Sequence, residues 1–394
     1  MTTDHFRFEL QARDPDTGAR AGILYTPHGE VPTPVFMPVG TQGTVKALCQ
    51  QDLRSADVRI ILGNTYHLYL RPGERLIAEA GGLHRFTGWD RAILTDSGGF
   101  QVHSLAALSK ITEEGVVFRS HIDGSSHQFT PEKAIEIEHA LGADIIMAFD
   151  ECTAPLCSFD YAKQAGDRTL RWLRRCVERH DGLGRRSASG SAQALFGIVQ
   201  GSAYPELRAA YADATVRFDL PGYAVGGTGL GERKEDTWTA VEVVTSRLPE
   251  DRPRYLMGIG LPEDLIDGVA RGIDMFDCVV PTRNARNGTV FTRRGRMNFK
   301  SAAWARDFSP IDPDCRCYTC QHYSRAYLRH LYHAGEITGL RLATLHSVHF
   351  FMDLMRDMRS AILAGRFAKW RTEFLSTYRS DPSPQPPPPK GEGE

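Results

Sequence analysis

Short apolar segments that alternate with helix-forming stretches constrain the fold of this chain more than any other feature. Such segments are β-branched or apolar and bounded by Gly, Pro or polar residues, which is typical of buried strands. They cover residues 59–63, 92–95, 144–149, 195–199, 223–225, 255–259 and 275–280. Helix signals lie between them, at Thr130-Pro131-Glu132, across 161–179 and at Pro262-Glu263-Asp264. The alternation predicts a parallel sheet with helices outside it.

A closed (β/α)₈ barrel and an open doubly wound sheet both fit this pattern. No Gly-x-Gly-x-x-Gly sequence opens a helix near the start of the chain, which counts against a dinucleotide-binding sheet. The 394 residues are 41% hydrophobic, which suffices for a large core in one or two domains.

Polar residues and glycines follow the predicted strands at the point where each strand ends. In a barrel, the carboxyl ends of the strands meet at one mouth, where the active sites of this fold lie. The residues at these positions are Asp96, Ser97, Gly98, Gly99, Phe100, Asp150, Gln200, Gly226, Gly227, Met257 and Asp277. They predict a polar pocket in which the backbone approaches a flat ligand closely.

Three of these residues are carboxylates, and paired carboxylates suit glycosidic chemistry. One attacks the anomeric carbon while another moves protons on the leaving group. The candidates are Asp96, Asp150 and Asp277. An Asp after a strand can equally be a helix N-cap. Asp277 resists that explanation because it lies inside an apolar run, where a carboxylate is costly unless it is paired or functional.

A second motif is Cys315-x-Cys317-x-x-Cys320, followed by His346. Three thiolates and an imidazole match a closed, four-coordinate structural zinc site. Other histidines near the motif leave the fourth ligand open: His322, His330, His333 and His349.

Basic residues concentrate directly after Asp277. Residues 281–306 hold seven Lys or Arg and no acid, although the formal net charge of the chain is -1. A charge run is often only a solvated surface, but its place beside the predicted pocket favours contact with phosphates.

The chain lacks the signals of export or membrane insertion. Its first ten residues include Asp4, His5, Arg7 and Glu9 and lack the apolar stretch of a signal peptide, and no run of 18 apolar residues occurs. We therefore expect a cytoplasmic protein with no membrane span. The Pro-rich segment 381–394 is expected to be a disordered tail.

Taken together, the motifs resemble those of the tRNA-guanine transglycosylase (queuine tRNA-ribosyltransferase) family, bacterial type. The resemblance runs from about Phe6 to about Tyr378. The segments that carry it are LTDSGGFQV, FDEC, GIVQG, AVGG, YLMGIG, MFDCVVPTRNARNG and CRCYTC with TLH, in this order. It implies a (β/α)₈ TIM barrel with an inserted zinc-binding subdomain near the C-terminus. We expect one catalytic domain over 1–380, with the subdomain at about 290–350.

The resemblance also implies a reaction. Family members exchange guanine at the wobble position, 34, of tRNAs with a GUN anticodon (those for Asp, Asn, His and Tyr). Bacterial members insert 7-aminomethyl-7-deazaguanine by covalent double displacement, in queuosine biosynthesis. The alternatives are a queuine-inserting member and a zinc-containing barrel glycoside hydrolase. A non-catalytic RNA-binding paralogue would lack the catalytic acids, whereas Asp96 and Asp277 are both present.

Roles for individual residues follow from the same resemblance. Asp277 would be the nucleophile and Asp96 the general acid and base. The substrate base would lie against Ser97, Gly98, Gly99, Phe100, Asp150, Gln200, Gly227 and Met257. RNA would contact Gly258, Ile259, Gly260, Leu261, Pro262, Glu263, Asp264, Thr282, Arg283, Asn284, Ala285 and Arg286. One structural zinc ion per subunit would be held by Cys315, Cys317, Cys320 and His346.

The sequence departs from the family pattern in two places. Leu230 stands where bacterial members usually have Val and queuine-using eukaryotic members have Gly, which favours the smaller bacterial base. Leu261 stands where many bacterial members carry Lys, which puts one anticodon contact in doubt. Family members usually dimerise, and Lys46, Tyr327 and His330 match interface positions, so a homodimer is expected.

Overall fold

A computed structural model describes residues 6–104, 110–154 and 157–378 of the chain. Eight parallel strands form a closed barrel, because the last strand pairs with the first. The strands are β4 (Val35–Gly40), β5 (Ile60–Asn64), β6 (Ala92–Asp96), β10 (Ile145–Met147), β11 (Ala194–Val199), β12 (Gly222–Val225), β13 (Arg254–Leu256) and β14 (Met275–Cys278). The closed barrel is thus confirmed, and the open sheet is excluded.

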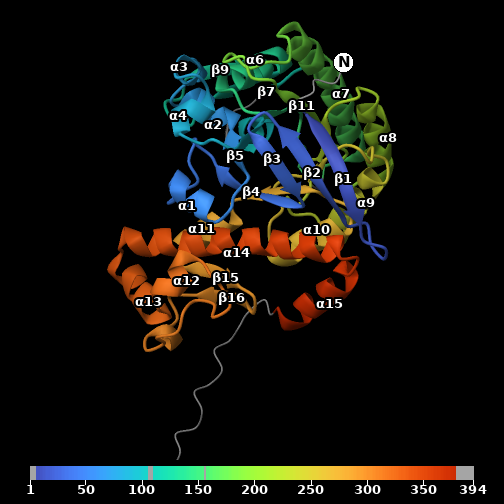
Figure 1. The fold of residues 1–394 in the computed structure, drawn as a ribbon. Coiled ribbons are helices and arrows are strands. Elements are labelled where there is room, and N and C mark those ends of the chain that lie inside the picture. Colours follow the sequence, from blue (N-terminus) through green and yellow to red (C-terminus); the bar gives the residue numbers. More distant parts are fainter. Residues whose placement is uncertain (1–5, 105–109, 155–156, 379–394) are drawn as a thin grey trace, which may run out of the picture.

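Helices follow the strands and surround the barrel (Figure 1). They are α1 (Gln50–Ser55), α2 (Thr65–Leu70), α3 (Glu74–Glu79), α4 (Leu83–Thr87), α5 (Gly99–Ser104), α6 (Pro131–Leu141), α7 (Phe159–Gly182), α8 (Pro205–Val216), α9 (Lys234–Thr245), α10 (Pro262–Ala270) and α11 (Val280–Arg286). The predicted start of α6 is confirmed, because the Thr130 hydroxyl accepts a hydrogen bond from the Lys133 N–H at 3.2 Å.

A three-stranded antiparallel sheet closes the amino end of the barrel. It consists of β1 (Arg7–Arg13), β2 (Arg20–Thr26) and β3 (Gly29–Thr33). Phe8, Leu24 and Val31 from this sheet share one apolar core with residues of the barrel strands. The buried Arg20 donates to the Asp274 carboxylate, just before β14, at 2.9 and 2.8 Å. A second small sheet, β7 (Lys110–Ile111), β8 (Val116–Arg119) and β9 (Ser126–Phe129), lies between β6 and α6 in the chain.

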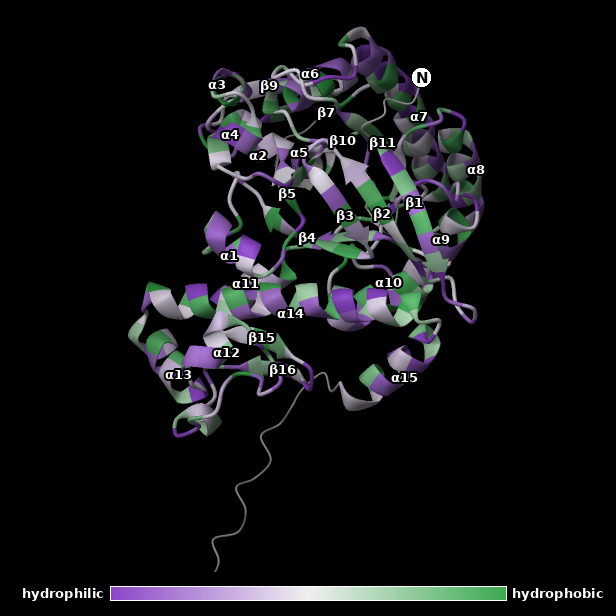
Figure 2. Cartoon of the chain, viewed as in Figure 1, coloured by the Kyte–Doolittle hydropathy of each residue, from purple (hydrophilic) through white to green (hydrophobic). Residues whose placement is uncertain are grey.

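The C-terminal part adds a subdomain with a core of its own. It contains β15 (Thr289–Thr292), β16 (Gly295–Asn298), a 3₁₀ turn (Ala302–Trp304), α12 (Tyr318–His322) and α13 (Arg325–Ala334). The long α14 (Ile337–Leu363) lies between this subdomain and the barrel, and α15 (Phe367–Thr377) follows it (Figure 1). Hydrophobic and hydrophilic stretches alternate along α14 in Figure 2, as expected for a helix that packs on both neighbours.

Some strand boundaries differ from the predicted ones. β13 ends at Leu256 rather than continuing to Ile259, because Gly258 turns the chain with a φ of 75°. β14 ends at Cys278, and Val280 already begins α11. The expected disordered tail, 381–394, lies outside the described residues. Among the helices that the structure describes, none is long and apolar enough to cross a membrane.

Candidate active site and metal centre

A cavity of about 250 Å³ opens at the carboxyl ends of the barrel strands. Its walls bring together all the residues that the sequence placed at strand ends. The lining includes Asp96, Ser97, Gly98, Gly99, Phe100, Asp150, Gln200, Gly226, Gly227, Met257, Gly258 and Asp277, together with Leu230 and Tyr255.

Asp277 occupies the end of β14 and receives two hydrogen bonds on the same oxygen. The Tyr255 hydroxyl donates to Oδ1 at 2.6 Å, and the Gly258 N–H donates at 2.8 Å. No described residue donates to Oδ2, so that oxygen is the one available to attack a ligand. Burial raises the pKa of Asp277, and the two hydrogen bonds oppose the rise because they favour the carboxylate.

Asp96 ends β6 in a more desolvated position. Its side chain accepts hydrogen bonds from Asn64 Nδ2 at 2.5 Å and from the Thr65 N–H at 3.0 Å. Burial raises the pKa of Asp96 to about 7, and the nearby Asp277 and Asp150 carboxylates add to the rise. A carboxyl group with this pKa can both donate and accept a proton near neutral pH.

Asp150 forms the polar floor of the cavity with Gln200 and Ser97. Gln200 Nε2 donates to Asp150 Oδ2 at 2.6 Å, and the Ser97 hydroxyl donates to Oδ1 at 3.3 Å. Burial raises the pKa of Asp150 to about 6, while these donors hold it down. No described residue donates to Gln200 Oε1, although that oxygen is buried. Such a group meets its hydrogen-bonding requirement when a ligand fills the site.

Two glycines are needed where the backbone approaches the floor. A Cβ on Gly99 would lie 2.7 Å from the Asp150 carbonyl oxygen. Gly227 has a φ of 63°, and a Cβ there would lie 2.3 Å from Gln200 Oε1. The open side of the cavity is flanked by the exposed ring of Phe100 and the half-buried Met257. Such faces suit a flat aromatic ligand.

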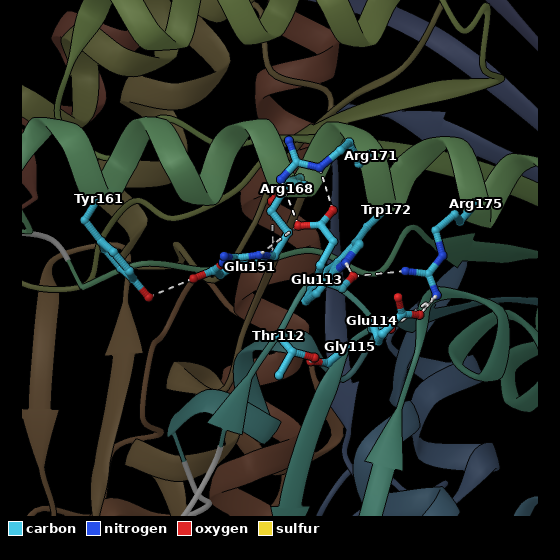
Figure 3. A network of polar contacts seen from close by, with 11 residues as sticks. Thr112, Glu113, Glu114, Gly115, Glu151, Tyr161, Arg168, Arg171, Trp172 and Arg175 are labelled. Atoms are coloured by element: carbon cyan, nitrogen blue, oxygen red, sulfur yellow. Dashed lines mark hydrogen bonds and ion pairs between the residues drawn. The ribbon is translucent and has the colours of Figure 1, made fainter.

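A polar network behind the floor was not predicted from the sequence (Figure 3). Glu151 follows Asp150 directly, and its buried carboxylate forms an ion pair with Arg168 of α7. The Tyr161 hydroxyl donates to the same carboxylate at 2.8 Å. Arg171 binds Glu113, in the turn between β7 and β8, at 2.5 Å. The network therefore fastens both the segment after β10 and the small β7–β9 sheet to one helix.

The four predicted metal ligands converge in the subdomain. The Sγ atoms of Cys315, Cys317 and Cys320 lie 3.6, 3.5 and 3.3 Å from His346 Nδ1. Tetrahedral zinc would separate a bound sulfur from a bound nitrogen by roughly 3.5 Å. His346 Nε2 lies 2.8 Å from the Phe291 carbonyl oxygen, which fixes the tautomer that leaves Nδ1 free to bind. The cluster is compatible with one structural zinc ion.

The predicted RNA-contacting residues begin at the cavity-lining Gly258 and continue, after the cavity-lining Val279, at residues 282–286. We call these residues the rim, and only some of their side chains are accessible. Ile259, Pro262, Thr282 and Ala285 are buried, whereas Arg283 is exposed. Gly258 is also exposed, and Asn284 and Arg286 are partly so. Asp264 forms an ion pair with Lys234 at 2.6 Å. Among these side chains, that of Arg283 on α11 is the most exposed.

Comparison with known proteins supports the family that the sequence motifs resemble. A family model described as queuine tRNA-ribosyltransferase matches residues 14–380. The chain belongs to the queuine tRNA-ribosyltransferase family. It is 56% identical over 374 residues to the queuine tRNA-ribosyltransferase of Pelotomaculum thermopropionicum, which covers 95% of this chain and 99% of that protein. It is 57% identical over 374 residues to that of Symbiobacterium thermophilum, with 95% of this chain and 92% of that protein covered.

As a member of the queuine tRNA-ribosyltransferase family, the chain is an enzyme of the pentosyltransferase class. The family match also excludes the alternative that this chain is a zinc-containing barrel glycoside hydrolase. Tyr255 and the Glu151–Arg168 pair are additional parts of the site. Tyr255 and Glu151 stand in the quoted segments YLMGIG and FDEC, but neither was predicted as a site residue, because each acts through a neighbour in space.

Proposed function

We propose that this enzyme is a tRNA-guanine(34) transglycosylase that replaces guanine at the wobble position of GUN-anticodon tRNAs. The pairing of an accessible Asp277 with an Asp96 of raised pKa, in one base-sized cavity, carries the proposal. Asp277 Oδ2 attacks the ribose C1′, the bond from C1′ to the base nitrogen breaks, and Asp96 gives its proton to the departing base. In the second step, Asp96 removes a proton from the incoming base, which displaces Asp277. Two inversions retain the configuration.

The incoming base that the site fits best is 7-aminomethyl-7-deazaguanine, used in queuosine biosynthesis. Asp150 accepts from the N–H groups of a guanine-like edge, and Phe100 and Met257 cover the ring faces. Leu230 lines the cavity and takes up space that a larger substituent needs, which favours this base over queuine. A queuine-inserting enzyme remains the alternative.

The tRNA would lie across the rim and the basic part of the subdomain. Arg294, Lys300 and Arg306 are exposed, whereas Arg293 is paired with Asp357 at 2.7 Å. Exposed cations in this arrangement suit a phosphate backbone. We further propose that residues 1–380 act as one catalytic domain in the cytoplasm, with the zinc-binding subdomain at about 290–350. Zinc would hold the subdomain in shape and take no part in the reaction.

The rate of guanine release should fall as the pH rises through about 7. Asp96 must be protonated to release the base, and this form is present below its pKa of about 7 and lost above it. Single-turnover release of guanine, measured from pH 5 to 9, should fall about tenfold per pH unit above this value. Asp96→Asn should be slower by roughly 10²- to 10⁴-fold and should lack this limb. A wild-type rate that stays constant from pH 6 to 9 would contradict the role of Asp96.

A homodimer is expected to form through α13. Tyr327 on this helix is 43% exposed, and its ring stacks on Tyr323 at 5.6 Å. Exposed aromatic rings are typical of protein interfaces. Sedimentation equilibrium of the wild type should give twice the chain mass of 43.9 kDa. Tyr327→Asp should shift the mass toward one chain, and a monomeric wild type at micromolar concentration would rule the dimer out.

The transglycosylase assignment is tested by incorporation of labelled guanine into unmodified tRNA. A tRNA with a GUN anticodon should take up one label per molecule. The same tRNA with adenine at position 34 should take up none. Equal labelling of both would show that the enzyme does not read the wobble base.

A further inference from the structure

Arg208 is a fully buried cation beside the cavity, and it forms no ion pair with any described carboxylate. It lies on α8 with 0% exposure, and none of the described carboxylates is within ion-pair distance of it. Its guanidinium instead donates to four backbone carbonyls that join the ends of β11 and β12. These are Ser202 at 2.8 Å, Val199 at 2.9 Å, Gly226 at 2.6 Å and Gly227 at 2.9 Å.

Burying an arginine with only backbone carbonyls as hydrogen-bond partners is costly. Burial lowers the pKa of Arg208 to about 10, so the group still carries its charge at neutral pH. All five N–H donors of a guanidinium point in fixed directions, which lets one side chain hold several carbonyls in one orientation.

The held carbonyls determine which atoms the cavity wall presents. In a planar trans peptide, the N–H points opposite to the carbonyl. With the Gly226 and Gly227 carbonyls turned to Arg208, the N–H groups of Gly227 and Thr228 point away from it. Both residues line the cavity, and neither N–H donates to any described group. Glycine would otherwise let these peptides rotate, since Gly227 already has a φ of 63°.

We propose that Arg208 is a positioning and specificity-determining residue that keeps this wall a pair of hydrogen-bond donors. The wall then accepts a base with a carbonyl oxygen at the facing edge and rejects a base with an amino group there. A donor that meets another donor leaves both without a partner in a desolvated site. This inference rests on the proposed function, because it specifies which bases the same cavity takes.

The test compares guanine with 2,6-diaminopurine, which differs in having an amino group in place of the 6-oxygen. Each base is used as a competitor against labelled guanine in the exchange assay. The wild type should prefer guanine by at least about 100-fold in inhibition constant. Arg208→Lys keeps the positive charge but removes the planar guanidinium with its five N–H donors. It should raise KM for guanine by about tenfold or more, with a smaller change in kcat, and reduce the preference by about tenfold.

Arg20→Lys is the matched control, because Arg20 is a buried arginine that also donates to backbone carbonyls, at 3.0 Å to Glu250, but at the opposite end of the barrel. It should lower the thermal midpoint without changing the preference for guanine. An unchanged preference in folded Arg208→Lys would overturn the inference. If that variant does not fold, a wild type that binds both bases within threefold overturns it equally. Absence of exchange by the wild type would instead refute the proposed function itself.

Discussion

Replacing Asp277 by alanine should reduce guanine exchange by on the order of 10⁴-fold or more, the largest effect expected of any single substitution. Asp277 is the carboxylate with a free oxygen in the cavity, and its other oxygen is held by Tyr255 and Gly258. Without it, no covalent bond to the ribose can form. The wild type should yield an enzyme–tRNA adduct that survives denaturing electrophoresis, and the variant should yield none.

Tyr255→Phe is the informative comparison for this prediction. It removes the 2.6 Å hydrogen bond to Asp277 and keeps the ring and the carboxylate. We expect a loss of about 10- to 100-fold, with adduct formation retained, because only the orientation of the nucleophile is affected. Near wild-type exchange by Asp277→Ala, in folded protein, would show that another group attacks the ribose.

Cys317→Ala should remove the metal and destabilise the subdomain by several kcal/mol. Cys317 is 2% exposed and lies in the subdomain core. Loss of the metal should therefore loosen the packing of β15, α12 and α13 against one another. Zinc content measured by mass spectrometry should fall from one per chain to none. Hydrogen exchange should rise in α12 and α13 while the barrel strands stay protected.

Cys49→Ala is the control for that experiment, because Cys49 is exposed and lies outside the metal cluster. It should keep one zinc per chain and the wild-type exchange pattern. A Cys317→Ala protein that still holds one zinc, or that shows unchanged protection in α12 and α13, would refute the four-ligand site. Activity should decline with the metal as well, since the basic residues 293–306 belong to this subdomain.

Regular patterns allowed much of the barrel to be predicted. Seven of its strands are apolar runs, and the acids and glycines at their ends mark the mouth. β4 was missed: its Pro38 lacks an N–H, and proline inside an apolar run counts against a central strand. The strands β1 and β3 were missed because their residues switch between buried and exposed, so no continuous apolar run marks them.

Local patterns fail where a residue acts through partners far along the chain. The hydroxyl of Tyr255 reaches Asp277 across neighbouring strands, 22 positions away. Arg208 reaches the glycine pair 18 and 19 positions later. In the sequence both look like ordinary core or helix residues. Only the three-dimensional structure shows that Tyr255 binds Asp277 and that Arg208 binds the carbonyls of the glycine pair.

The most direct test counts how many guanines leave the tRNA for each new base that is incorporated during turnover. Purified enzyme is incubated with tRNA of GUN anticodon, labelled in guanine 34, and with 7-aminomethyl-7-deazaguanine. The account predicts one label released for each new base incorporated, with no abasic tRNA and with little reaction when queuine replaces the smaller base. Release of guanine that leaves an abasic site, or no release from intact zinc-loaded enzyme, would contradict transglycosylation by this site.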